Sequence, residues 1–214
     1  MNQELKARVD AALRYIPKKG KLLEIGSYPF IVTKYLIEKG YDVEGLDKNH
    51  TKQAISVSPC DIETDKYPFK DNTFDIVLML EVVEHLGVNP IHALKEAHRV
   101  LKPKGVIVIT TPNILRLQNL KSIIFRRKQL ATLRSLTQKE SIGYMSHIRE
   151  YTKIELKEIL EFCKFEVKDI YMFEGSKNKL TKCIVFIFPF FSTTIVISGN
   201  KVKKCQNDVH SVEQ

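Results

Sequence analysis

Acidic residues close or follow four short apolar segments in the first half of the chain. They are Glu24, Asp47, Asp61 and Glu81, and Glu84 and His85 come shortly after the last of them. In an open α/β sheet, ligands bind beyond the carboxyl ends of the strands, so these side chains could line one site. Carboxylates accept hydrogen bonds from hydroxyl and amino groups. The pattern therefore favours a ligand rich in those groups over one dominated by phosphates.

The sequence lacks the glycine-rich loops that hold phosphates. No G-x-G-x-x-G and no G-x-x-x-x-G-K-[ST] follows an apolar segment, which argues against an NAD-dependent dehydrogenase and a P-loop enzyme. The four cysteines stand singly, which argues against a zinc ribbon and a disulfide scaffold. Reduced thiols, together with an N-terminus that has no long apolar run, predict a cytoplasmic protein.

The elements that would position these residues alternate between strands and helices. The nearly unbroken apolar run Phe74–Leu80 is typical of a parallel strand buried on both faces. Helices are expected over Gln3–Ile16, Ile31–Lys39 and Pro90–Val100, and strands over Lys21–Ile25, Asp42–Leu46, Ile55–Cys60, Phe74–Leu80 and Val106–Thr110. This alternation predicts an α/β fold, a Rossmann-like doubly wound seven-stranded mixed sheet with helices on both faces.

The second half supplies the remaining elements. Thr152 and Glu155 have the spacing of a capping box, which predicts a helix after them, and Phe165–Phe173 alternates as a strand. The apolar stretch Cys183–Ser198 is too short to span a bilayer. We expect it to be a connecting segment that ends in a final strand over Thr194–Ser198.

In order and spacing, these segments resemble the motifs of class I S-adenosylmethionine (SAM) dependent methyltransferases, closest to the small-molecule subgroup that includes the ubiquinone-biosynthesis O-methyltransferases. The likeness runs from about Lys18 to Thr110, with a weaker continuation in Thr111-Pro112-Asn113 and His147-Ile148-Arg149-Glu150-Tyr151-Thr152. Its main motifs are Leu22-Leu23-Glu24-Ile25-Gly26, Val43-Glu44-Gly45-Leu46-Asp47, Cys60-Asp61-Ile62, Phe74-Asp75-Ile76-Val77, Glu81-Val82-Val83-Glu84-His85-Leu86 and Leu101-Lys102-Pro103-Lys104-Gly105. The resemblance implies SAM as the cofactor and methyl transfer as the activity.

The resemblance also assigns residues to the cofactor. Glu24 and Gly26 would form the first loop together with Ser27 and Tyr28, with Gly26 admitting close approach of the methionine moiety. Asp47 would accept hydrogen bonds from both ribose hydroxyls.

Three further residues complete the implied cofactor site. Asp61 would take the adenine amino group while Ile62 packs on the ring, and Glu81 would lie near the methionine end. Asp47 and Asp61 could instead be ordinary turn residues, and Glu24 could be a solvated strand end.

The first loop departs from the family pattern of acid-x-Gly-x-Gly-x-Gly. Tyr28 and Phe30 stand where the second and third glycines would be. Large side chains at these positions would crowd the cofactor or require a shifted loop. A non-catalytic binding module that keeps the fold without binding SAM is therefore an alternative to the enzyme.

The Glu-x-x-Glu-His motif permits two further roles. His85 or His147 could act as a general base toward a hydroxyl acceptor. By resemblance to plant small-RNA 2′-O-methyltransferases, Glu81, Glu84, His85 and His147 could instead hold a divalent cation. The metal-free interpretation is the preferred one, and no residue is assigned to a metal.

The predicted reaction is methyl transfer to an oxygen, and less favourably to nitrogen or carbon, of a small-molecule acceptor. One domain is expected over 1–214, with an N-terminal helix (1–17), a SAM-binding half (18–110), a basic substrate lid (111–151), a C-terminal helix and strands (152–200) and a tail (201–214).

Most of the net charge of +9 falls after Thr110. Much of it lies in the basic amphipathic segment 116–134, which has no acidic residue. This segment keeps an RNA methyltransferase open as an alternative. A peripheral membrane contact is the less favoured use of the same charge, and the sequence does not indicate an oligomeric state.

Overall fold

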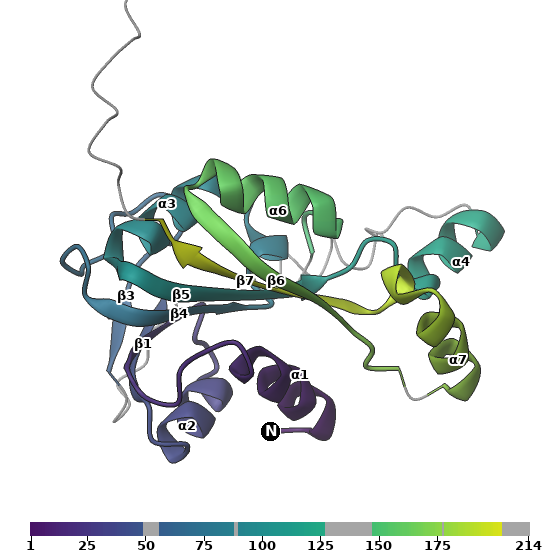
Figure 1. Ribbon diagram of the computed structural model, residues 1–214, viewed down its shortest axis with the longest axis horizontal. Coiled ribbons are helices and arrows are strands. Elements are labelled where there is room, and N and C mark those ends of the chain that lie inside the picture. Colours follow the sequence, from purple (N-terminus) through teal and green to yellow (C-terminus); the bar gives the residue numbers. More distant parts are fainter. Residues whose placement is uncertain (49–55, 88–89, 127–146, 177, 203–214) are drawn as a thin grey trace, which may run out of the picture.

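The computed structural model describes residues 1–48, 56–87, 90–126, 147–176 and 178–202 of the 214-residue chain. At its centre is a seven-stranded sheet in the order β3-β2-β1-β4-β5-β7-β6, with helices on both faces (Figure 1). The predicted mixed, doubly wound sheet is therefore confirmed.

Strands β1 to β5 are parallel, and β7 runs antiparallel to both of its neighbours. The strands are β1 (Lys21–Ile25), β2 (Asp42–Asp47), β3 (Val57–Pro59), β4 (Phe74–Leu80), β5 (Leu101–Pro112), β6 (Phe165–Phe173) and β7 (Thr194–Lys201). The chain order reverses between β1 and β4, because β2 and β3 continue on one side and β5 on the other. A ligand crevice is expected at the carboxyl ends of these two strands.

Within the described residues, four helices form the two layers that cover the sheet (Figure 1). They are α1 (Gln3–Leu13) and α2 (Ile31–Glu38) on one face, and α3 (Ile91–Val100) and α6 (Lys153–Phe162) on the other. The capping box predicted for α6 is present, with Thr152 and Glu155 bonded reciprocally.

Each layer packs on the sheet through its own apolar core. Leu36 of α2 belongs to one cluster with Ile76 of β4, and Leu94 of α3 and Leu156 of α6 belong to the other with Val77. Consecutive residues of a strand point to opposite faces. Apart from Asp75, strand β4 is thus apolar because both of its faces are buried.

Further elements lie at the end of the sheet where the crevice is expected. They are η1 (Val83–His85) after β4, α4 (Leu117–Arg126) after β5, and α7 (Lys179–Ile187) with η2 (Pro189–Phe191) between β6 and β7. Both α4 and α7 project beyond the sheet (Figure 1). None of the helices in the described residues is long and apolar enough to cross a membrane.

Strand β5 begins earlier than the sequence predicts. It was expected from Val106, but it starts at Leu101, which pairs with Phe74. The register then shifts before Ile76 pairs with Val106, and Lys104 adopts a φ of 66°. Residues 102–105 are therefore an irregularity inside the strand.

The connection from Cys183 also differs from its prediction, because α7 is helical from Lys179. The Asn178 side chain caps this helix by accepting hydrogen bonds from the N–H groups of Leu180 and Thr181. The strand predicted over Thr194–Ser198 is confirmed and extends to Lys201.

Other boundaries also differ from the prediction or are only partly described. The first helix ends at Leu13, before the predicted Ile16. Of the predicted lid and basic segment, α4 covers Leu117–Arg126, and residues 127–146 lie outside the described residues. Part of the predicted third strand and most of the tail also lie outside them.

Candidate functional site

The first loop begins at a carboxylate that is buried. Glu24 is 3% exposed and accepts a hydrogen bond of 2.5 Å from the Thr33 hydroxyl of α2. Burial, reinforced by the negative charge of Asp47, raises the pKa of Glu24 to about 8 against the opposing effect of the Thr33 hydrogen bond. A solvated strand end, one alternative for Glu24, is therefore wrong.

Gly26 is required by the packing of the loop itself. Its φ is 74°, which side chains rarely adopt, and an added Cβ would lie 2.6 Å from Cγ2 of Val82. Val82 follows β4, so this contact brings the loops after the two central strands together. The predicted reason for the glycine was close approach of the ligand, whereas the structure gives a steric reason within the protein.

The two aromatic residues of the loop have different surroundings. Phe30 is 1% exposed, whereas Tyr28 is 53% exposed, and their rings meet edge to face. Phe30 adopts a φ of 65° immediately before α2. A left-handed conformation costs a residue other than glycine about 1 to 2 kcal/mol, which explains why a glycine would suit this position.

Asp47 lies at the carboxyl end of β2, opposite the first loop. Its Oδ2 accepts a hydrogen bond of 2.9 Å from the backbone N–H of Tyr28. Asp61 follows β3, and the Lys48 ammonium, 2.9 Å away, lowers the pKa of Asp61 below its usual range. Ile62 packs against the apolar core. The structure thus brings the predicted ribose and adenine residues to one edge of the sheet.

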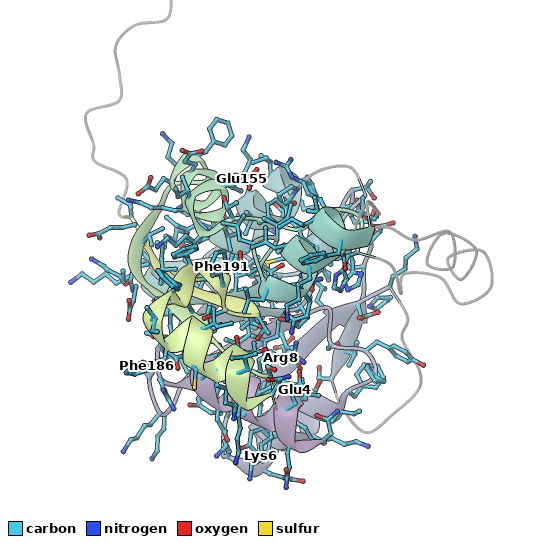
Figure 2. The ribbon with its side chains drawn as sticks, turned by 90° about the vertical axis from the view of Figure 1, so that its right-hand side faces the viewer. Glu4, Lys6, Arg8, Glu155, Phe186 and Phe191 are labelled. Carbon is cyan, nitrogen blue, oxygen red and sulfur yellow. The ribbon has the colours of Figure 1, made fainter. Side chains whose placement is uncertain are left out.

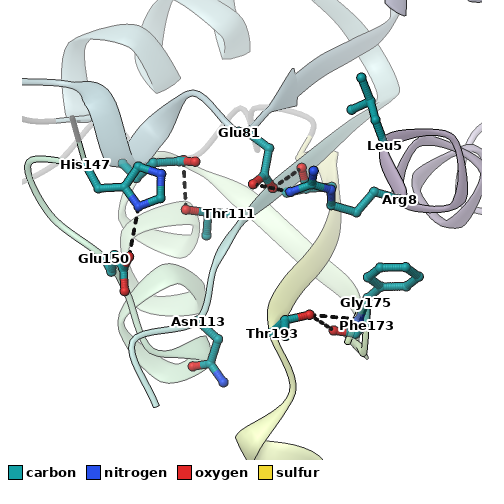
Figure 3. A network of polar contacts seen from close by, with 12 residues as sticks. Leu5, Arg8, Glu81, Thr111, Asn113, His147, Glu150, Phe173, Gly175 and Thr193 are labelled. Atoms are coloured by element: carbon teal, nitrogen blue, oxygen red, sulfur yellow. Dashed lines mark hydrogen bonds and ion pairs between the residues drawn. The ribbon is translucent and has the colours of Figure 1, made fainter. Parts of the chain in front are cut away.

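Glu81 is held by contacts from two other elements. Its Oε2 accepts a hydrogen bond of 2.7 Å from Nη1 of Arg8 on α1, and its Oε1 accepts one of 2.9 Å from the Thr110 hydroxyl on β5 (Figure 3). Glu81 has a φ of 58°. Such strain in a residue other than glycine is typical of functional sites. No sequence pattern indicated that Arg8 would lie here.

A second group of side chains lies next to Glu81 and combines one carboxylate with two imidazoles. Atoms of Glu84, His85 and His147 lie within 4.8 Å of one another, and the two imidazole rings are 5.1 Å apart. Glu84 is fully buried, and its Oε2 accepts a hydrogen bond from the Thr111 hydroxyl. Glu81 is not a member of this group. Of the four residues that the sequence suggested for a divalent cation, the structure therefore brings three together.

His147 is oriented by Glu150, three residues further on. Its Nδ1 lies 2.9 Å from Oε1 of Glu150 (Figure 3). Two nitrogens of Arg116 and the Asn119 amide also donate to this carboxylate. Burial alone would raise the pKa of Glu150, but the hydrogen bonds from His147, Arg116 and Asn119 lower it to about 2. Glu150 is therefore ionised at neutral pH.

This ionised carboxylate fixes the tautomer of His147. The carboxylate accepts a hydrogen bond from Nδ1–H, so in the neutral imidazole the lone pair is on Nε2. The sequence signal for the contact was the i, i+3 spacing of a histidine and a glutamate, which the predictions did not use.

The buried carboxylate of Glu84 makes stability depend on pH. Burial, followed by the charge of Glu81, raises the pKa of Glu84 from 4.5 to about 8. Between these two pKa values the folded protein keeps a proton that the unfolded chain releases. The free energy of unfolding therefore falls as the pH rises from about 4.5 to about 8. The variant Glu84→Gln is expected to increase the free energy of unfolding at about pH 8.5 by on the order of 2 kcal/mol.

Urea denaturation at about pH 5 and pH 8.5, with a chelator present, measures this effect. The gain should be much smaller at the lower pH, where the Glu84 carboxyl of the folded protein is protonated. Glu158→Gln, at an exposed position, is the matched control and should change neither value. An equal effect of Glu84→Gln at both pH values would contradict the assignment.

The fold and the site define a class of protein. A doubly wound sheet with carboxylates after adjacent parallel strands, and without a phosphate loop, is the architecture of class I methyltransferases. Residues 1–169 match the methyltransferase domain family, and the chain belongs to that family.

Individual relatives support this assignment, although each of them matches a smaller part of the chain than the family does. An uncharacterised methyltransferase of Schizosaccharomyces pombe is 31% identical over 122 residues, 48% of this chain and 44% of that protein. The ubiquinone biosynthesis O-methyltransferase of Azorhizobium caulinodans is 28% identical over 108 residues, covering 45% and 42%. The matched part of the chain spans less than half the length of these two relatives.

The fold also has solved relatives. The crystal structure of a SAM dependent methyltransferase from Archaeoglobus fulgidus is similar with a TM-score of 0.64 and 20% sequence identity, covering 92% of this chain and 93% of that one.

Proposed function

We propose that the protein is a SAM-dependent methyltransferase that transfers a methyl group to an oxygen of a small-molecule acceptor. The observation that carries the proposal is the set of carboxylates after three adjacent strands, Glu24, Asp47 and Asp61, at the reversal of chain order. This set matches a ligand that offers hydroxyl and amino groups, as a nucleoside with an amino acid does.

The residues present fit such a cofactor. Asp47 would hold the ribose, and Asp61 and Ile62 the adenine, with Lys48 displaced from one oxygen of Asp61. Among the described residues, the buried Oγ of Ser27 has no hydrogen-bond partner. A buried polar atom without a partner is unfavourable, and a bound ligand that formed a hydrogen bond with this hydroxyl would remove that cost.

Residues near β4 would hold the methionine end. Arg8 donates to Glu81 through Nη1, while its buried Nε has no hydrogen-bond partner within the described part of the chain. A guanidinium beside a carboxylate offers complementary contacts to the two charges of an amino acid. When bound, the cofactor supplies an electrophilic methyl group on a sulfonium. The protein needs to align the acceptor with it.

His147 is the proposed general base toward the acceptor hydroxyl. Its Nε2 carries the lone pair because Nδ1–H donates a hydrogen bond to the Glu150 carboxylate. Arg116 and Asn119 fix that carboxylate and hence the ring. The ring centroid of His85 lies 5.1 Å from that of His147. His85 would also contact the acceptor or take part in the proton transfer. Proton removal by a positioned imidazole contributes about 10²- to 10⁴-fold to the rate.

A divalent cation held by Glu84, His85 and His147 is the second mechanistic candidate. The observation that favours it is Oε1 of Glu84, which is buried without a hydrogen-bond partner in the described residues and lies 3.9 Å from Nε2 of His85. The Glu150 contact to His147 is also the kind that orients metal-binding imidazoles. In this case the cation would orient the acceptor oxygen, and His147 would be its ligand.

Calorimetry with SAM and with S-adenosylhomocysteine tests the proposed function. Binding in the micromolar range is expected for both, followed by S-adenosylhomocysteine release with an acceptor from a panel of hydroxylated small molecules. Failure to bind either compound would favour the non-catalytic module. Turnover on RNA and on none of the small molecules would favour the RNA alternative, whose basic residues Arg127 and Lys128 lie outside the described residues.

A further inference from the structure

The connection between β6 and β7 is longer than the geometry of the two strands requires. They are antiparallel neighbours in which Phe173 pairs with Thr194, and a tight turn can join such strands. Instead, residues 174–193 carry α7 and η2 and project beyond the sheet (Figure 1). The connectivity of the sheet therefore does not explain this insertion.

The base of the insertion is firmly attached to the sheet. The Thr193 hydroxyl accepts a hydrogen bond of 2.9 Å from the N–H of Gly175 and donates one of 3.1 Å to the carbonyl of Phe173 (Figure 3). The Asn113 amide, at the end of β5, donates to the carbonyl of Phe190 at 2.8 Å. These bonds hold α7 and η2 in a fixed position relative to the candidate site.

The outer face of the insertion is apolar and exposed. Phe186 is 88% exposed and Ile187 67%, and Phe186 points away from the molecule in Figure 2. On α4, which projects from the same end of the sheet, Phe125 is 81% exposed and Ile124 65%. Large apolar side chains that are exposed together on projecting elements indicate an interaction surface. We call the exposed residues of 123–125 and 180–190 the projecting surface.

The charged residues within the segments that carry the projecting surface are all basic. The segments 113–126 and 175–202 contain no acidic residue. Lys121 on α4 and Lys179 and Lys182 on α7 are exposed. Large apolar side chains bordered by lysines are the composition of helices that lie in the interface of an anionic membrane.

We propose that the projecting surface docks the protein peripherally on an anionic lipid bilayer. Phe186, Ile187 and Phe125 would enter the boundary between headgroups and acyl chains, while Lys179 and Lys182 would contact the headgroups. With nine residues, α7 is far shorter than the roughly 20 that span a bilayer, so it would lie in the plane of the interface.

Charge and side-chain type favour lipid over the other occupants of such a surface. A symmetric dimer through this surface would bring the lysines of both copies together. Nucleic acid would match the lysines but gains little from exposed isoleucine and leucine. Residues 127–146 of the same chain carry four basic residues and one acidic residue, so they do not complement the charge.

Vesicle flotation of the full chain tests the proposal without SAM or an acceptor, so its outcome is independent of the proposed function. Vesicles of phosphatidylcholine are compared with vesicles that also contain phosphatidylglycerol. The protein is expected to float with the anionic vesicles and much less with the neutral ones, and added salt should weaken the interaction.

Variants distinguish binding through the projecting surface from nonspecific hydrophobic adsorption to vesicles. Phe186→Ser is expected to lower the partition coefficient about tenfold, and Lys182→Gln about fivefold. Phe162→Ser is the matched control, because Phe162 is 64% exposed but ends α6 beside the start of β6, at the opposite end of the sheet. Thermal melts verify that each variant is folded.

Three results would overturn the proposal. The first is no flotation with anionic vesicles at low salt. The second is an equal loss in the Phe186 and Phe162 variants. The third is a dimer in light scattering, or binding to a polyribonucleotide, that Phe186→Ser abolishes while flotation is unchanged.

Discussion

Replacing Asp47 by alanine is expected to weaken SAM binding roughly 100-fold or more. Asp47 is the proposed partner of both ribose hydroxyls, and a hydrogen bond to a charged group contributes about 1.5 to 3 kcal/mol. Loss of two such bonds corresponds to two or more orders of magnitude in the dissociation constant. Calorimetry with SAM and S-adenosylhomocysteine measures the change, which should be similar for the two because they share the ribose.

Two companion variants separate this effect from a change of the loop. Asp47→Asn keeps an oxygen for the N–H of Tyr28, which Asp47 binds at 2.9 Å, and should retain part of the affinity. Asp42→Ala removes an exposed aspartate at the other end of the same strand and should leave binding unchanged. Unaltered SAM affinity in Asp47→Ala would contradict the assignment of the ribose to Asp47.

The sequence predicted the parallel half of the fold closely because its signals are local. The apolar runs of β1 and β4 give the same boundaries in sequence and structure. The capping box of Thr152 and Glu155 was also found correctly, since both partners lie within one turn. Helix α7 was missed because the apolar run from Cys183 was interpreted as a connecting segment without a helix, whereas Lys179–Ile187 is helical and several of its apolar residues are exposed.

The candidate site was predictable in part for a related reason. Strand ends are visible in a sequence, so Glu24, Asp47 and Asp61 could be named. Their partners could not be named in the same way. Arg8 reaches Glu81 across 73 positions, and the pair forms only when α1 packs beside the crevice. Contacts between distant segments leave no periodic pattern.

Burial of the polar residues was equally hidden from the sequence. Glu24 and Glu84 are fully or nearly fully buried, although glutamate is among the residues least often buried without a partner. Their environment comes from the loops after β1 and β4, which meet where Gly26 contacts Val82. A single sequence shows the glutamates but not the enclosure that changes their chemistry.

Replacing His147 by alanine is the second change with a large expected effect, a fall in kcat of about 10²- to 10³-fold with SAM affinity unchanged. The imidazole is proposed to act on the acceptor and not on the cofactor, so calorimetry with SAM should give the wild-type value. Turnover is measured as S-adenosylhomocysteine release with the acceptor identified in the panel. Added imidazole should restore part of the rate if His147 is the base.

Glu150→Gln tests whether Glu150 acts through its charge or only through its packing. The substituted amide keeps the shape of the side chain and an oxygen for the Asn119 contact, but it removes the charge that fixes His147. A smaller fall in kcat, about tenfold, is therefore expected. Arg149→Gln, which removes the neighbouring Arg149–Glu155 ion pair at an exposed position, is the control and should keep full activity.

The same variants decide between a base and a metal ligand. If His147 binds a cation, activity requires added Mg²⁺ or Mn²⁺, a chelator abolishes it, and Glu84→Gln is as inactive as His147→Ala because both remove ligands. If His147 is the base, chelator has no effect and imidazole rescues only the His147 variant. Activity retained by His147→Ala without imidazole or metal would exclude both roles, because proton removal would then need no side chain at this position.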